Sequence, residues 1–133
     1  MLLTKKTEYA ILSLVAIAKS TTPKNVDVLS RELNIPKPYL AKILQTFSKS
    51  DILESYKGVN GGFLLAVQPE KISLLMITTI SEERTPTVFE CSPSVESCPG
   101  NRADSCHLWS TLNALQNKID NFLENITLKD ILQ

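Results

Sequence analysis

Residues 33–67 read LNIPKPYLAKILQTFSKSDILESYKGVNGGFLLAV, and this stretch determines the architecture of the first half of the chain. Asn34 tolerates the left-handed conformation that ends a helix, so the amphipathic segment 26–33 is expected to end there. Pro36 and Pro38 permit a helix to start but cannot lie in its interior. The apolar residues that follow share one helical face: Leu40, Ile43, Leu44 and Phe47. The pattern predicts a helix-turn-helix.

The rest of this stretch predicts a β-hairpin. Residues 52–56 and 63–67 have the composition of strands, and the glycine-rich segment 57–62 between them is typical of a turn. A hairpin that follows a helix-turn-helix is a wing, whose glycines let the backbone approach a phosphate chain or a minor groove. The segment GVNGGF is not a nucleotide-binding fingerprint, because no helix follows it directly. We therefore predict a winged helix.

The distribution of charge favours a nucleic-acid partner for the front half. Residues 1–60 carry nine Lys and Arg against five Asp and Glu, a net +4, whereas residues 61–133 carry five against nine, a net −4. Helix pairs without a DNA function are common, but the hairpin and the charge together favour double-stranded promoter DNA with paired half-sites. The candidate DNA-binding residues are Lys37, Pro38, Tyr39, Lys42, Lys57, Gly58, Asn60, Gly61 and Gly62.

The flanking segments predict further helices. A largely apolar helix, capped by Thr4 or Thr7, precedes the helix-turn-helix, and another begins near Ser73. A long helix is expected from Asp104, as its N-cap, to about Asn125. Its apolar residues have heptad-like spacing: Leu108, Leu112, Leu115, Ile119, Phe122 and Ile126.

Two interpretations of this apolar stripe are open. It packs on its own domain, or it forms a homodimer, which is favoured because winged-helix proteins usually meet paired half-sites. Antiparallel and crossed helix packing are equally compatible with the spacing. We expect a DNA-binding domain at 1–80, a cysteine-bearing loop at 81–103, and a dimerisation helix with a C-terminal tail at 104–133.

Composition places the chain among ordinary globular proteins. Its 133 residues are about one domain, with 43% hydrophobic and 21% charged residues. No apolar run reaches the roughly eighteen residues of a membrane span, and the N-terminus lacks the layout of a signal peptide. We expect a cytoplasmic protein, in which an odd number of cysteines indicates metal or redox chemistry rather than disulfides.

All three cysteines lie close together, in the segment CSPSVESCPGNRADSCH. Cys91, Cys98 and Cys106 occupy a Pro-, Ser- and Gly-rich loop, and the single histidine, His107, follows directly. Structural cysteines usually lie inside apolar segments, so small buried hydrophobes fit this pattern poorly. Three soft thiolates in one loop predict a site for a thiophilic metal or an iron–sulfur cluster.

Four segments resemble one known family: MLLTKKTEYAI at the start, LNIPKPYLAKILQTFSKSDILES, the wing YKGVNGGFLL, and the ending LENITLKDIL. They are similar to the bacterial iron–sulfur transcription regulators that include IscR, NsrR and RirA. The resemblance covers essentially the whole chain. It implies a homodimer of winged helices with long dimerisation helices. It also implies a 2Fe-2S or 4Fe-4S cluster whose state changes promoter affinity, so that the protein, expected to be a repressor, senses redox, nitric oxide or iron status.

The resemblance also suggests cluster ligands. Cys91, Cys98 and Cys106 match the three cluster cysteines of the family in order, although the gaps here are six and seven residues rather than about five. Relatives take a fourth ligand from a histidine beyond the third cysteine or from an acid in the first helix of the partner subunit. His107 and Glu8 are the corresponding candidates.

Two other classes remain as alternatives. One is a zinc-bound or cluster-free winged-helix regulator, in which the three cysteines and His107 would bind zinc. The other is an electron carrier or scaffold that does not bind DNA, against which the wing and the basic front half argue. We do not expect an enzyme, because the histidine has no acid or nucleophile partner outside the loop and no glycine motif opens a helix.

Overall fold

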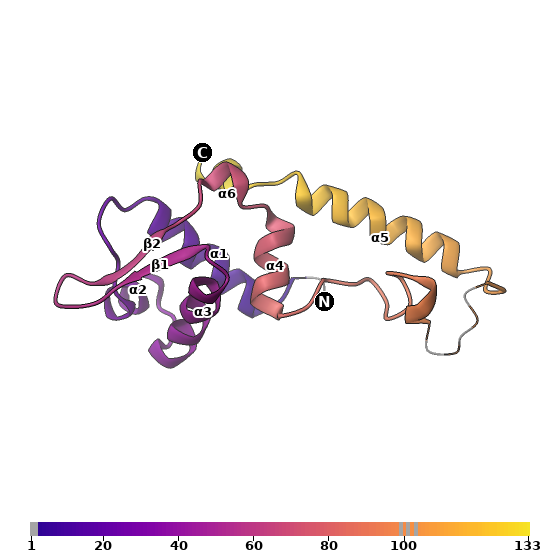
Figure 1. The fold of residues 1–133 in the computed structure, drawn as a ribbon, viewed down its shortest axis with the longest axis horizontal. Helices are drawn as coiled ribbons and strands as arrows, with labels where there is room; N and C mark the ends of the chain where they lie inside the picture. Colours follow the sequence, from indigo (N-terminus) through magenta and orange to yellow (C-terminus); the bar gives the residue numbers. More distant parts are fainter. Residues whose placement is uncertain (1–2, 99, 101, 103) are drawn as a thin grey trace.

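The computed structural model describes residues 3–98, 100, 102 and 104–133. Figure 1 shows an elongated molecule. Helices α1 (Lys5–Ala18), α2 (Val26–Leu33) and α3 (Lys37–Lys49) lie at one end, together with the hairpin of β1 (Leu53–Tyr56) and β2 (Gly62–Leu65). Helix α5 (Trp109–Glu124) reaches toward the other end, and α4 (Leu74–Glu82) lies between them. The prediction of a mainly helical fold with a small hairpin is confirmed.

Local capping signals set the ends of the front helices. The Thr4 side chain accepts a hydrogen bond from the Thr7 amide at the start of α1, and Asn25 accepts one from Val28 at the start of α2. Asn34 ends α2 with a φ of 55°, as predicted. Pro36 lies at the N-cap of α3 and Pro38 in its first turn. Backbone amides there have no acceptor within the helix, so the missing amide hydrogens cost no helical hydrogen bond.

The hairpin is antiparallel, and the start of β2 is fastened to the loop before α2. Its register pairs Leu53 with Leu65 and Tyr56 with Gly62. Each strand has 4 residues and is therefore shorter than predicted. The Phe63 amide donates to the Lys24 carbonyl at 2.8 Å, and the Lys24 amide donates back at 3.0 Å. Gly62 has a φ of 150°, and a Cβ there would lie 2.4 Å from the Lys24 carbonyl carbon. Only glycine fits at this position.

One hydrophobic core joins the front helices, the hairpin, α4 and the C-terminal helix. Its buried residues are Ala10, Leu14, Ile17, Leu29, Ile35, Leu40, Ile43, Leu44, Phe47, Ile52, Leu53, Ile72, Ile77 and Leu128. Ser73 caps α4 by accepting from the Met76 amide, which confirms the predicted start of that helix. A short 3-10 turn, η1 (Pro69–Lys71), connects the hairpin to α4.

Helix α5 is shorter than predicted. It begins at Trp109 rather than just after Asp104, and residues 104–108 lie mostly in turns. A second 3-10 turn, η2 (Val95–Ser97), lies in the loop before it. Helix α5 ends at Asn125, as predicted.

The chain then returns to the front. Helix α6 (Leu128–Leu132) starts with a capping box between Thr127 and Asp130. The Leu74 amide donates to the Ile126 carbonyl at 2.7 Å, and the Leu128 amide donates to the Ile72 carbonyl at 2.8 Å. We call α1–α4, the hairpin and α6 the front body, and the described residues of 83–125 the arm. No helix in the described part of the chain is long and apolar enough to cross a bilayer.

Candidate nucleic-acid interface and cysteine loop

Helix α3 turns one face to the core and leaves the other free. Leu40, Ile43, Leu44 and Phe47 are buried, whereas the predicted contact residues Lys37, Pro38, Tyr39 and Lys42 are all exposed. Because Pro36 and Pro38 have no amide hydrogen, the first turn of α3 offers few backbone donors. Recognition by this helix must therefore use its side chains.

Ion pairs distinguish the lysines of this surface. The Lys37 ammonium lies 2.7 Å from the Asp27 carboxylate of α2, and both side chains are exposed. The hydrogen bond from Lys37, and then its charge, hold the pKa of Asp27 below its ordinary value. Among the described residues, Lys42 and Lys57 make no ion pair. The positive charges of Lys42 and Lys57 are therefore less neutralised by carboxylates than the charge of Lys37.

Tyr39 is held in place by the first helix. Its ring meets the Tyr9 ring edge-on, with centroids 5.5 Å apart and an interplanar angle of 86°. The Lys5 ammonium lies 5.3 Å from the centroid of the Tyr9 ring. With 40% of its surface exposed, Tyr39 remains available to a partner while its orientation depends on α1.

At the wing, backbone geometry accounts for all three of the predicted glycines. Gly58 has a φ of 102°, and a Cβ on Gly61 would lie 2.3 Å from the Tyr56 carbonyl oxygen. Gly58, Gly61 and Gly62 are thus needed for the hairpin itself, and Lys57, Gly58 and Asn60 are exposed. Val59, which the sequence reasoning did not single out, is 99% exposed at the tip.

The structure does not bring the three cysteines together as a metal centre. Cys91 and Cys98 are half-buried and Cys106 is exposed. Within the described residues, no three His, Cys, Asp or Glu side chains are grouped so as to hold a metal ion. The Arg102 amide donates to the Cys98 sulfur at 3.3 Å. Three thiol donors suit iron–sulfur clusters and zinc chemically, but ligation requires the loop to rearrange.

One part of the loop is nevertheless fixed. Trp109, Asn113 and Gln116 of α5 form hydrogen bonds to residues 86–93, including one from the Trp109 indole to the Cys91 carbonyl at 2.9 Å. None of these three residues was predicted from the sequence to be functional. Polar side chains on a helix are normally solvated, and their partners here lie 18 to 30 residues earlier in the chain.

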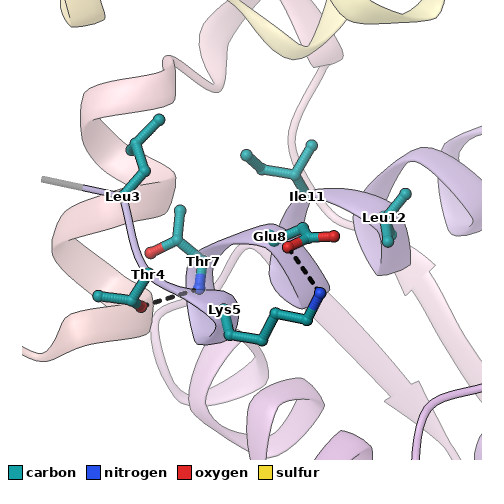
Figure 2. Close-up of a pocket in the computed structure, with 7 residues that line it drawn as sticks. All are labelled: Leu3, Thr4, Lys5, Thr7, Glu8, Ile11 and Leu12. Atoms are coloured by element: carbon teal, nitrogen blue, oxygen red, sulfur yellow. Dashed lines mark hydrogen bonds and ion pairs between the residues drawn. The ribbon is translucent and has the colours of Figure 1, made fainter. Parts of the chain in front are cut away.

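Both candidate fourth ligands are accessible. The Glu8 carboxylate lies 3.0 Å from the Lys5 ammonium, at a hollow of about 390 Å³ on α1 whose apolar side chains are Leu3, Ile11 and Leu12. Figure 2 shows Glu8 reaching toward Lys5 beside these residues. His107 is exposed next to Cys106 and lies before α5, rather than inside the helix that was predicted to begin after Asp104.

A polar cluster joins α1 to the end of α4, where the cysteine loop leaves the front body. The Thr4 and Thr7 hydroxyls both donate to the Glu82 carboxylate, the second at 2.9 Å. Partial burial opposes ionisation of Glu82. The hydrogen bonds from Thr4 and Thr7, with Lys6 and Arg84 nearby, outweigh that effect and hold its pKa below the ordinary value.

The predicted dimerisation residues of α5 differ in how far their side chains are exposed. Leu108, Leu115 and Phe122 are 58%, 42% and 66% exposed, and Ile119 is half-buried. Leu112 is only 8% exposed within its own chain. The free apolar stripe therefore consists of residues seven positions apart, which lie on one side of the helix.

Comparison with known proteins supports a regulatory role. A family model described as "Rrf2: Iron-dependent Transcriptional regulator" matches residues 3–133. The chain is 34% identical to an HTH-type transcriptional regulator of Synechocystis, covering 98% of this chain and 87% of that protein. It is 28% identical to the HTH-type transcriptional regulator IscR of Pectobacterium atrosepticum, covering 99% of this chain and 79% of that protein.

Solved structures share the fold. The global cysteine regulator CymR of B. subtilis superposes with a TM-score of 0.73 at 20% identity, covering 98% of this chain and 95% of that one. T. potens IscR superposes with a TM-score of 0.71 at 22% identity, covering 98% and 85%. Proteins with these two descriptions have one fold, so the fold does not determine the signal or the cofactor.

Proposed function

Because this chain belongs to the Rrf2 family of iron-dependent transcriptional regulators, we propose that it is a homodimeric repressor whose cysteine loop carries an iron–sulfur cluster. Regulation of transcription by a helix-turn-helix protein, rather than enzymatic catalysis, is the established role of this family. One observation carries the finer proposal. An exposed helix-and-wing surface lies at one end of the molecule, and all three cysteines lie in the arm at the other.

DNA binding is assigned to α3 and the wing. Helix α3 enters the major groove with Tyr39 and Lys42, and the wing brings Lys57 and the backbone around Gly58 to an adjacent phosphate chain or minor groove. The absence of ion pairs at Lys42 and Lys57 within the described residues supports this assignment, because neither charge must first be released from a carboxylate. Lys37 would exchange Asp27 for a phosphate.

Dimerisation is assigned to α5. Leu108, Leu115 and Phe122 form an exposed apolar stripe along it, and the α1 hollow with Leu3 and Leu12 is a second exposed apolar surface. Burial of such surfaces against a second copy is favourable by about 25 cal/mol per Å² of apolar area. Two copies related by a two-fold axis would present two α3 helices to paired half-sites.

Cys91, Cys98 and Cys106 are the proposed cluster ligands, with either Glu8 of the partner subunit or His107 as the fourth. The bound cluster would supply a redox-active centre that is sensitive to oxidants, nitric oxide and iron supply. The exposed position of Cys106 and the half-buried positions of Cys91 and Cys98 leave the thiols within reach of such species. Ligation by Glu8 would require it to leave Lys5.

A contiguous set of contacts could carry a change in the loop to the DNA surface. The loop leaves α4 directly after Glu82, which binds Thr4 and Thr7 at the start of α1. Tyr9, two residues beyond Thr7 on α1, supports Tyr39 at the start of α3. Regulation requires that the two states of the loop favour different positions of α3, since a ligand with equal affinity for both states shifts nothing.

The second candidate is a zinc-bound or cluster-free regulator. The donor set of the loop favours it, because three thiols and one imidazole form a common structural zinc set. In that case the signal would not be a change in a cluster.

Purification without oxygen, followed by a visible absorption spectrum and assays of iron, sulfide and zinc, separates the two candidates. We expect a brown protein with matched iron and sulfide, bleached by nitric oxide and colourless in Cys98→Ala. A colourless wild-type protein that carries zinc, or no metal after reconstitution, would rule out the cluster. Binding to promoter and random DNA over a range of salt excludes a carrier without DNA affinity if the affinity falls steeply with salt.

A further inference from the structure

Gln116 is a buried polar residue that uses its whole amide group to hold the cysteine loop. Its side chain is 2% exposed. The amide oxygen accepts hydrogen bonds from the Val88 amide and the Ser92 hydroxyl, both at 2.8 Å. The amide nitrogen donates to the Pro86 carbonyl at 2.9 Å and to the Asp120 carboxylate at 2.8 Å. Every hydrogen-bonding position of this amide is occupied.

Two neighbours on α5 extend the contact. The Asn113 amide donates to the carbonyls of Ser92 and Pro93, at 2.8 Å and 3.3 Å, and the Trp109 indole donates to the Cys91 carbonyl at 2.9 Å. Residues 109, 113 and 116 are spaced by four and three, so they share one face of the helix. This face therefore fixes the backbone on both sides of Cys91, which lies directly before Ser92.

These contacts are mutually dependent. A buried amide group that has no hydrogen-bond partner destabilises the folded protein by about 1–3 kcal/mol. Loss of the contact would therefore leave polar groups unpaired both on Gln116 and in the backbone of residues 86–92. Among the described residues, no buried side-chain nitrogen or oxygen lacks a hydrogen bond. A fully paired polar cluster of this kind holds one arrangement, because each alternative leaves a group unpaired.

We propose that Trp109, Asn113 and Gln116 are positioning residues that hold Cys91 on α5 before a metal binds, and that Cys98 and Cys106 are brought to it. This inference rests on the proposed function, because it assumes that the three thiols share a metal group. The exposure of Cys106 in the turns before α5 fits a ligand that moves to the site. Residues that orient metal ligands typically contribute 10–100-fold in metal affinity.

The first experiment examines the contact in the metal-free full-length protein, by hydrogen–deuterium exchange of the segment 86–93. Gln116→Met keeps the length of the side chain and removes its donors and acceptor. We expect exchange at the Val88 amide to become about tenfold faster or more. Asn121→Ala, an exposed change on the same helix, is the matched control and should leave exchange unchanged. Equal exchange in wild type and Gln116→Met would overturn the proposal.

The second experiment tests positioning with cobalt(II) as the metal probe, titrated without oxygen and followed by thiolate-to-cobalt charge-transfer absorption. We expect Gln116→Met to bind cobalt at least about tenfold more weakly than wild type and Asn121→Ala. Equal affinities, despite faster exchange, would leave Gln116 a structural residue and overturn the inference alone. A wild-type protein without the thiolate band in cobalt, and without iron after reconstitution, would instead overturn the proposed cluster function as well.

Trp109→Phe provides a milder variant if Gln116→Met fails to fold. It keeps an aromatic ring and removes the indole donor to the Cys91 carbonyl. We expect a cobalt affinity between those of wild type and Gln116→Met, with an unchanged circular dichroism spectrum. Wild-type cobalt affinity in a folded Trp109→Phe protein would show that the indole contact does not position Cys91.

Discussion

The front body and the arm are held together by different forces. The front body buries a continuous set of Leu, Ile and Phe side chains, among which Phe47, Leu40 and Leu44 of α3 are at most 1% exposed. In the described residues of the arm, the buried aliphatic side chains are Leu112 and Leu123, and Ser92 and Gln116 are buried polar residues. The arm therefore depends on directional hydrogen bonds where the front body depends on apolar burial.

This difference suits the two tasks proposed for the protein. Apolar burial is non-directional and close-packed, so the front body can present α3 and the wing in a constant arrangement. Away from the Gln116 cluster the arm is less constrained, because Cys106 is exposed in the turns before α5, so this part of the loop can change its arrangement at lower cost. A DNA-reading surface needs the first property, and a sensor needs the second.

The largest effect is expected from a substitution in the hydrophobic core of the front body. Phe47→Ala leaves a cavity in the hydrophobic core and should cost about 3–5 kcal/mol in the free energy of unfolding. Urea denaturation followed by far-ultraviolet circular dichroism measures the loss. A midpoint equal to that of wild type would contradict the assignment of stability to this core.

Phe122→Ala removes the same ring from the arm, where it is 66% exposed. We expect little effect on the fold of one chain and a loss of at least about 2 kcal/mol in dimerisation, roughly 30-fold in the dissociation constant. Sedimentation equilibrium provides the measurement. Val59→Ala, which shortens a fully exposed apolar side chain at the wing, is the control and should leave the dimer intact. A monomeric wild-type protein would refute the dimer itself.

Lys42→Ala tests whether DNA affinity belongs to the front body. Lys42 is exposed on α3 and has no ion pair among the described residues, so its removal should weaken binding and lower the salt slope by about one. Lys118→Ala removes the same charge from the exposed surface of α5 and should leave the slope unchanged. If both variants reduce the slope equally, the arm also contacts DNA.

The smallest effect is expected at the junction of the two regions. Because the folded protein holds the pKa of Glu82 below its ordinary value of 4.5, ionised Glu82 stabilises the fold above that pH. The stabilisation is lost as the pH falls through the lower, folded pKa. Glu82→Gln removes this dependence, so its stability should fall less than that of wild type between about pH 7 and about pH 3. The difference should be under about 1 kcal/mol, and thermal unfolding across this range measures it.

Local signals in the sequence predicted the front body well. Asn34, the prolines before α3 and the glycines of the wing act through backbone conformations that each residue imposes on its own neighbours. Capping by Thr4 and Ser73 is likewise local, since the side chain bonds an amide three residues later. The strands differed only at their ends, where pairing rather than composition sets the limits.

The arm was less predictable, because its determinants are distant in sequence. Asp104 has the residue type of an N-cap, yet the chain still turns at 104–108 and α5 starts at Trp109. The role of Gln116 depends on carbonyl and amide groups up to 30 residues away. Leu112 belongs to the heptad pattern but lies buried in its own chain, which the pattern alone does not distinguish from an intersubunit position.

The return of the chain after α5 has a mechanical consequence. Backbone hydrogen bonds from Leu74 and Leu128 fasten the C-terminal end of α5 beside the start of α4, while its other end lies far from the front body (Figure 1). A helix pinned at one end is a lever with its fulcrum at that end. The 16 residues of α5 span about 24 Å, so a tilt of about 10° at the fulcrum moves the far end by about 4 Å. Conversely, a displacement of about 4 Å at the cysteine loop requires a rotation of only about 10° where α5 meets the core.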